Sequence, residues 1–246
     1  GHNVSFASKS LLNLNLDVKR VSRLVHSTEA DAWIVLAGPQ DVLEWFGTQA
    51  VPSFAMFGRR NTARIAGTGP NKQPALVDAL KNLTQLGHHK ISLMVRKEHR
   101  EPEPSPFART FLKEMEKNGI QTTSYHLPDW DDSGEGFRGC LDSLFKITPP
   151  TALILDEFFL FNAAQHHLAR RGILAPQHVS LICSDPDPAD AWSEPSVAHI
   201  HWESVHVVNR IVSWADHVAR GVPDRAQTLT KAKYVKGNTV GPASSR

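Results

Sequence analysis

Short apolar runs alternate along the chain with longer segments of helical periodicity. Runs rich in apolar or β-branched residues predict strands at residues 3–7, 32–37, 51–57, 65–67, 90–95, 121–125, 151–155, 179–183, 198–201 and 228–235. Segments with apolar side chains every three or four positions predict helices at residues 16–27, 41–47, 75–86, 107–118, 137–145, 158–171 and 205–219. Because strands and helices alternate, the pattern predicts an α/β fold built on parallel sheets.

The candidate chemistry centres on residues 151–186. Their two apolar runs flank a helix and predict a βαβ unit, in which the strands are parallel. Asp156 follows the first strand and Asp185 follows the second. Open α/β sheets bind ligands at the edge where the carboxyl ends of their strands meet. We therefore expect Asp156 and Asp185 to stand side by side at such an edge.

Composition narrows the class of protein. The 246 residues are 41% hydrophobic and 21% charged, as in ordinary globular proteins. A net charge of +2 gives no electrostatic footprint for nucleic acid in this chain. The two cysteines, Cys140 and Cys183, form no disulfide framework and favour a reducing compartment. The sequence lacks both the run of about 18 apolar residues needed to span a membrane and a signal-peptide core.

The sequence predicts no catalytic residue, metal site or cofactor. The stretch that begins at Asp129 starts like a calcium loop, but its twelfth residue is Cys140 rather than glutamate. The paired histidines lack a third ligand at suitable spacing. Neither a glycine-rich phosphate loop nor a nucleophile elbow is present.

Several segments in order resemble one family. They are LGHHKI before a strand, KNGI after a helix, TALILDE, RRGILAPQHVSLICSDPD, SEPSVAHIH and the tail KYVKGNTVGPA. Together they resemble the effector-binding domain of the lactose/galactose repressor (LacI/GalR) family, most strongly from Leu76 onward. The resemblance implies a periplasmic binding protein-like fold of type I. Two doubly wound parallel-sheet subdomains would be joined by three crossovers, with a small ligand in the cleft between them.

Applied to this sequence, the resemblance divides the chain into two subdomains. The N-terminal one would hold residues 1–68 and 204–222, and the C-terminal one residues 69–203 and 223–246. Family members carry an N-terminal helix-turn-helix head, which this chain lacks. The family's first, central strand also has no counterpart here, so we expect upstream residues to be missing from this sequence or the N-terminal subdomain to be atypical.

The resemblance implies that both acids contact the ligand. Asp156 stands where the family has a ligand-contacting Asn or Asp, and Asp185 matches its strand-end acid. Ionised carboxylates offer two acceptor oxygens for paired sugar hydroxyls. The alternatives are that Asp156 caps the helix at Phe158 and that Asp185 only shapes a turn with Pro186.

Four further residues are candidates for ligand contacts. Trp130 falls where members place a ring that stacks on the ligand, although it could instead pack on its own subdomain. Phe107 stands where many members have an arginine, which suggests a more apolar cleft wall. Phe57 and Arg59 end a strand of the first subdomain. Arg59 could serve an anionic ligand or be a solvated loop charge.

The leading hypothesis is the effector-binding and dimerisation domain of a LacI/GalR-type transcription regulator. It would be cytoplasmic and homodimeric, sense a small sugar-like metabolite, and control operator DNA through the absent helix-turn-helix head, without membrane or cofactor. One alternative is a periplasmic-type sugar-binding protein for transport or chemotaxis. Another is an α/β enzyme that uses Asp156 and Asp185 as acid and base.

Overall fold

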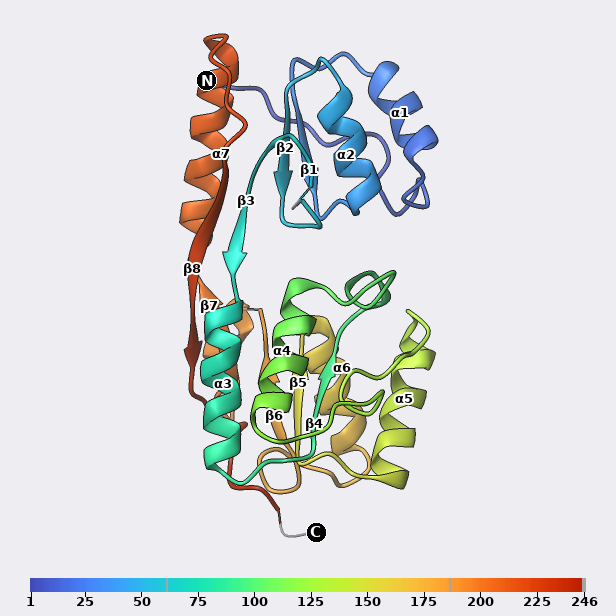
Figure 1. The fold of residues 1–246 in the computed structure, drawn as a ribbon, viewed down its shortest axis with the longest axis vertical. Helices are drawn as coiled ribbons and strands as arrows, with labels where there is room; N and C mark the ends of the chain where they lie inside the picture. The colour runs from blue at the N-terminus through green and yellow to red at the C-terminus, as the bar shows by residue number, and fades with distance from the viewer. Residues whose placement is uncertain (61, 186, 245–246) are drawn as a thin grey trace. The chain divides into compact units, whose positions relative to one another are not determined.

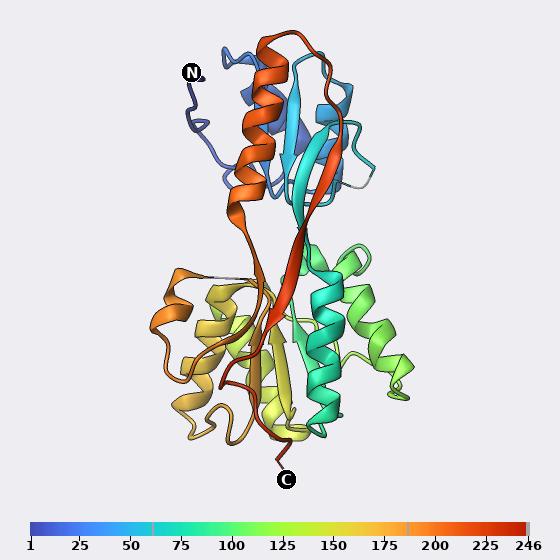
Figure 2. The same cartoon turned by 90° about the vertical axis from the view of Figure 1, so that its left-hand side faces the viewer.

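The computed structural model describes residues 1–60, 62–185 and 187–244, and its chain forms two compact units. Unit 1 comprises Gly1–Asn71 and Glu203–Lys231, and unit 2 comprises Lys72–Trp202 and the chain from Ala232 onward. The chain therefore passes between the units three times. Figures 1 and 2 show the elements of each unit.

Helices and strands alternate as the apolar pattern predicts. The helices are α1 (Val18–His26), α2 (Gln40–Thr48), α3 (Gln73–Gln85), α4 (Pro106–Lys117), α5 (Gly134–Ile147), α6 (Phe158–Ala169) and α7 (Ser204–Ala219). The strands are β1 (Trp33–Leu36), β2 (Ser53–Met56), β3 (Ala66–Asn71), β4 (Ile91–Met94), β5 (Ala152–Leu155), β6 (Ser180–Cys183), β7 (Ala198–Trp202) and β8 (Gln227–Val235). Short 3-10 turns lie at Lys97–His99 and Pro188–Trp192. Among the described residues, no helix combines the length and apolar character needed to span a bilayer.

Two predicted strands are wrong. Residues 3–7 are exposed throughout, with Phe6 fully open to solvent, because no strand pairs with them in the described chain. Residues 121–125 form no strand, and a turn closes between Thr123 and His126. There the backbone N–H of His126 bonds to the carbonyl of Thr123, and the Thr123 N–H bonds to the His126 ring. Local bonds of this kind compete with a sheet ladder.

Unit 1 holds a parallel sheet in the order β1-β2-β3, followed by the first part of β8. Helices α1 and α2 pack on one face, where Val35 and Ala55 point. Helix α7 packs on the other face, where Trp214 meets Phe54 with ring centroids 5.2 Å apart. Successive strand residues thus feed opposite faces, as the pleat requires.

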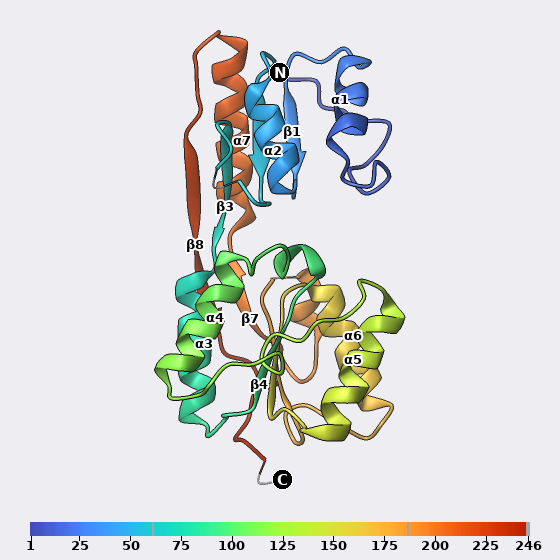
Figure 3. The ribbon, with the colours of Figure 1, turned by 45° about the vertical axis from the view of Figure 1, so that its right-hand side comes forward.

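Unit 2 holds β4, β5, β6 and β7 in parallel, with the second part of β8 antiparallel to β7. Helices α3 and α4 cover the face that carries Leu93 and Ile154. Helices α5 and α6 cover the opposite face, which carries Leu153 and Leu155 (Figure 3). Helices on both faces make unit 2 doubly wound, so the carboxyl ends of β4, β5 and β6 share one edge.

Strand β8 is divided between the units. Its residues 227–231 pair with β3, and its residues 232–235 pair with β7 (Figure 2). The predicted boundary at residue 223 assigned the whole strand to the C-terminal subdomain. The structure differs because hydrogen bonds to β3 hold the first five residues in unit 1.

Thr239 fixes the last part of the chain to unit 2. Its side chain is fully buried, accepts a hydrogen bond from the Ala198 N–H at 2.9 Å and donates one to the Leu181 carbonyl at 2.8 Å. The Thr239 hydroxyl therefore satisfies a buried N–H of β7 and a buried carbonyl of β6.

We predict that Thr239→Val lowers the free energy of unfolding by about 1–3 kcal/mol, because it leaves buried polar groups unpaired at unchanged side-chain shape. Urea unfolding measures the change. Thr84→Val is the control, since that hydroxyl bonds to the Lys81 carbonyl in an exposed part of α3. A loss in Thr239→Val no larger than in the control would contradict the role assigned to Thr239.

Candidate functional site

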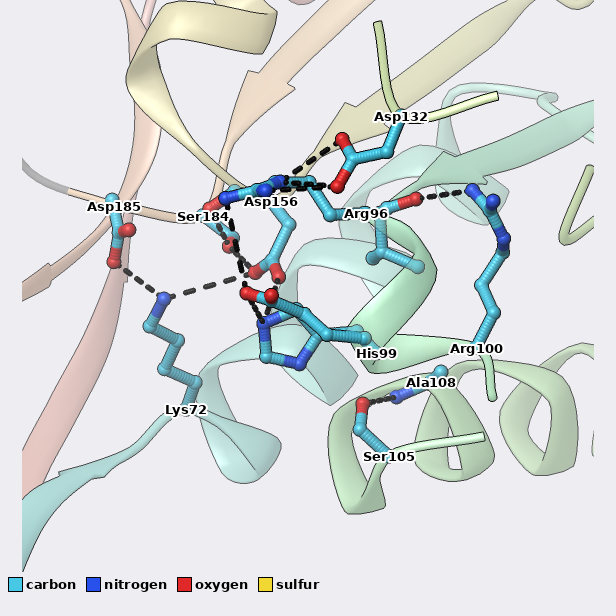
Figure 4. Close-up of polar contacts among 12 residues, drawn as sticks. Lys72, Arg96, His99, Arg100, Ser105, Ala108, Asp132, Asp156, Ser184 and Asp185 are labelled. Carbon is cyan, nitrogen blue, oxygen red and sulfur yellow. Dashed lines mark hydrogen bonds and ion pairs between the residues drawn. The ribbon is translucent and has the colours of Figure 1, made fainter. Parts of the chain in front are cut away.

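Polar side chains gather at the carboxyl edge of the unit 2 sheet. Arg96 and the turn Lys97–His99 follow β4, Asp156 follows β5, and Ser184 and Asp185 follow β6. Lys72 joins them from the N-terminus of α3. Parallel strands deliver the groups other than Lys72 to one edge, the usual ligand position in open α/β sheets (Figure 4).

Lys72 lies between the two acids. Its Nζ is 3.8 Å from Asp156 Oδ1 and makes a close ion pair with Asp185 Oδ1. The Lys72 side chain is 18% exposed, and those of Asp156 and Asp185 are 10% and 32% exposed. Asp156 is thus almost enclosed, whereas Asp185 still faces solvent.

Ser184 orients the buried acid. Its hydroxyl donates to Asp156 Oδ1 at 2.6 Å and lies 2.7 Å from the Asp156 carbonyl oxygen. The backbone N–H of Asp156 donates to the Met94 carbonyl at 3.0 Å. These bonds fix both the backbone and the carboxylate of Asp156 before any ligand arrives.

Lys72, Asp156 and Asp185 form the Lys72 triad. Burial and the neighbouring charges shift the pKa values of this triad in opposite directions. Burial alone would raise the pKa of Asp156, but Lys72, His99 and the Ser184 hydrogen bond outweigh it and lower that pKa. Burial alone would lower the pKa of Lys72, but the two carboxylates outweigh it and raise that pKa. For Asp185, burial outweighs Lys72, and the neighbouring charge of Asp156 adds to it, so its pKa is raised. Asp156 and Lys72 are therefore held in their charged forms.

A second acidic group lies beside the triad. Oxygen and nitrogen atoms of Glu98, His99 and Glu157 lie within 4.8 Å of one another, the one such set found in the described residues that could hold a metal ion. His99 Nε2 is 3.8 Å from Asp156 Oδ2, which links the two groups. Burial, followed by the charge of Asp156, raises the pKa of Glu157 to about 7.

Arg96 is already engaged by a carboxylate. Its guanidinium grips Asp132 through Nε at 3.0 Å and Nη2 at 2.8 Å (Figure 4). The hydrogen bond to Asp132 raises the pKa of Arg96. Hence Lys72 is the cation that directly contacts the two strand-end acids.

The structure brings Asp156 and Asp185 together as the strand pattern predicts. Asp156 does not cap α6, because Glu157 holds the N-cap position and no side chain bonds there. The alternative role of Asp185 involves Pro186, which lies outside the described residues. Whether either acid contacts a ligand stays a prediction.

The aromatic candidates of unit 2 lie in or against its cores. Trp130 is 7% exposed and packs on Phe137, with ring centroids 5.1 Å apart and the Arg100 guanidinium 5.1 Å from its ring centre. This is the packing that the sequence left open as its alternative. Phe107, in α4, is partly buried against the core between α3, α4 and the sheet.

Phe57 and Arg59 lie in unit 1, just after β2. Both are half-buried, and Phe57 has a left-handed backbone with φ of 63°. The structure therefore does not place them with the acids in one unit, and their ligand contacts stay a prediction.

Sequence reasoning missed Lys72. The signal available was its position in the stretch Pro70–Pro74, which interrupts the periodic pattern directly before α3. In such a stretch, the sequence predicts a solvent-exposed lysine. Its burial depends on the folded arrangement of β5 and β6, which residue spacing does not reveal.

Comparisons with known proteins give the family and the fold. A family profile described as periplasmic binding protein-like domain matches residues 80–240. No curated protein matches the chain significantly. The structure is similar to a LacI-type transcription regulator from Bifidobacterium animalis subsp. lactis (16% identity, TM-score 0.75, covering 91% of this chain and 84% of that one).

Two further solved structures are similar to the chain. One is a LacI family transcriptional regulator from Enterococcus faecium with bound ribose (16% identity, TM-score 0.72, covering 87% of this chain and 81% of that one). The other is the Escherichia coli transcriptional repressor ascG (14% identity, TM-score 0.69, covering 91% and 84%). At these identities the likeness shows the fold.

We predict that Glu157→Gln stabilises the protein at pH 8 but not at pH 5. The pKa of Glu157 is about 7 in the folded state against 4.5 ordinarily. The folded state therefore binds more protons than the unfolded state between these values, and wild-type stability falls as pH rises through them. With allowance for solvent screening, the gain at pH 8 is on the order of 1 kcal/mol.

Urea unfolding at both pH values measures this effect. Glu29→Gln is the control, because Glu29 is exposed in unit 1. Equal effects of the two substitutions at pH 8 would show that Glu157 is not held in a raised-pKa environment.

Proposed function

The chain belongs to the family of periplasmic binding protein-like domains, and from this premise we propose that it is the effector-binding and dimerisation domain of a LacI/GalR-type transcription regulator. The observation that carries the proposal is the Lys72–Asp156–Asp185 cluster at the carboxyl edge of the unit 2 sheet. Fixed polar groups at this edge support the proposal, because open α/β sheets usually bind small molecules there.

The effector we propose is a small sugar-like metabolite. A hydroxyl can donate to the Asp185 carboxylate and accept from the Lys72 ammonium, so neighbouring hydroxyls match the alternation of acceptors and donors at this edge. Asp185 is the more exposed of the two acids and would make first contact. A ligand hydroxyl would replace part of the contact between Lys72 and Asp185. The charge of Lys72 favours the ionised forms of both acids.

Signalling would work by a population shift. The effector favours the domain conformations that it binds best, and thereby changes the equilibrium of a homodimer whose helix-turn-helix heads read operator DNA. In this proposal the heads belong to the regulator but not to the chain described here. The protein would act in the cytoplasm and would catalyse no reaction.

The solved structures named above support a regulator over the other readings of the sequence. All three are transcription regulators, and one was solved with ribose. The geometry gives no specific support to acid–base catalysis, because the two acids converge on Lys72 rather than on an open reaction space.

We predict that at least one compound in a library of sugars and polyols raises the melting temperature, since it binds only the folded state. Asp185→Asn should weaken that compound's affinity about 10–100-fold. This factor corresponds to the loss of about 1.5–3 kcal/mol, which is typical of hydrogen bonds to a charged group. Calorimetric titration measures the affinity.

Asp142→Asn is the matched control, because Asp142 is a half-exposed acid on α5 in the same unit, paired with His167. It should leave the affinity unchanged. A library in which nothing shifts the melting temperature, or an Asp185→Asn variant that binds as tightly as the wild type, would count against the proposed site.

A further inference from the structure

Arg60 is a buried arginine of unit 1 that lies over β3. It follows β2, and its backbone carbonyl accepts hydrogen bonds from the Ala63 N–H at 3.1 Å and from Gln227 Nε2 at 2.9 Å. These bonds anchor the residue on the sheet. The whole residue is only 9% exposed.

Two glycines make room for the Arg60 side chain. A Cβ atom on Gly67 would stand 2.9 Å from Arg60 Cδ, and one on Gly69 would stand 3.0 Å from Arg60 Nη1. These residues are two apart on β3, so they open the same face of the strand. The guanidinium thus occupies space that side chains at these positions would fill, near the carboxyl end of the sheet.

The Arg60 guanidinium is poorly satisfied. In the part of the chain that the structure describes, it makes one hydrogen bond, from Nη2 to the Thr228 carbonyl at 3.4 Å, which is at the limit of hydrogen-bond length. Its Nε is fully buried without a partner. Within the described residues, no carboxylate pairs with it.

Two other arginines of low exposure have carboxylate partners, although the Nε of Arg100 is, like that of Arg60, buried without a hydrogen-bond partner. Arg100 donates to the carbonyls of Val95 at 2.7 Å and Trp130 at 2.6 Å and pairs with Asp129 at 2.9 Å. Arg210 grips Asp224 through two bonds of 2.7 and 2.8 Å. Arg60 is buried like them but has no acid.

An unpaired buried charge is costly. Burial lowers the pKa of Arg60, but arginine stays protonated in proteins, so the charge cannot be relieved by losing a proton. A planar guanidinium fork matches the geometry of carboxylate and phosphate oxygens. The missing partner is therefore chemically defined as an oxyanion.

We propose that Arg60 is the centre of an oxyanion site at the carboxyl edge of the unit 1 sheet. The site takes the carboxylate or phosphate group of a small molecule at the guanidinium, which itself occupies the space that Gly67 and Gly69 leave. It lies in a different unit from the Lys72 cluster, and its test does not depend on the proposed effector. The neighbouring Arg59, which the sequence offers either as a contact for an anionic ligand or as a solvated loop charge, is the less buried of the two.

Titration of the chain with potassium phosphate and with potassium acetate tests the site, with potassium chloride at matched ionic strength as reference. The readouts are the amide resonances of Gly67 and Gly69 and the melting temperature. We expect at least one oxyanion to give a saturable shift that chloride does not give. Phosphate alone identifies a phosphate site, and acetate alone identifies a carboxylate site.

Substitutions assign the effect to the guanidinium. Arg60→Gln should abolish the saturable shift, and Arg60→Lys should weaken binding at least tenfold because it loses the fork. Arg23→Gln, at an exposed arginine of α1 in the same unit, should bind like the wild type. In chloride alone, Arg60→Gln and Arg60→Met should melt no lower than the wild type, since no good partner is lost.

Three results would overturn the site. They are the absence of any oxyanion-specific shift in the wild type, an unchanged shift in Arg60→Gln, and a lower melting temperature of both Arg60→Gln and Arg60→Met in chloride. The last would show that the guanidinium already has the partners it needs within the protein.

Discussion

The candidate site of unit 2 depends on the buried ammonium of Lys72. Two carboxylates at neighbouring strand ends would repel each other and resist burial if nothing neutralised them. Lys72 supplies the opposite charge to both, and Ser184 supplies a hydrogen bond to the deeper one. Asp156 is therefore held in its charged form within a partly enclosed edge, and Lys72 opposes the rise that burial causes in the pKa of Asp185.

The fold sets this arrangement. Helices on both faces bury the strands of unit 2, so polar chemistry is left to the sheet edge, where β4, β5 and β6 end. The two units differ in the partners of the buried cation near this edge of their sheets. Unit 2 surrounds its lysine with carboxylates, whereas the buried Arg60 of unit 1 has no carboxylate partner among the described residues. A negatively charged ligand group would therefore match Arg60. A neutral polar group would match the Lys72–Asp156–Asp185 cluster, whose charges are already paired.

Local patterns predicted much of this architecture, and the features that they missed depend on side-chain packing and on hydrogen bonds that form only in the folded chain. Apolar periodicity located the helices and the βαβ unit, and strand direction placed Asp156 beside Asp185. The burial of Lys72 could not be predicted, since it arises from β5 and β6, which are far away in the sequence. The burial of Arg60 depends on how its side chain packs over Gly67 and Gly69, which residue spacing does not reveal. Trp130 shows the same limit, because a loop tryptophan looks alike whether it faces a ligand or packs on Phe137.

A direct test of the Lys72 triad is a nuclear magnetic resonance titration of the side-chain carboxyl carbons of Asp156 and Asp185. We expect Asp156 to titrate below the ordinary aspartate pKa of 3.8 and Asp185 above it, with both pKa values rising in Lys72→Met. Because the two acids are coupled, the titration is fitted as a pair. A pKa of Asp156 above that of Asp185 would contradict the central role of the buried ammonium. Unchanged pKa values of both acids in Lys72→Met would contradict it as well.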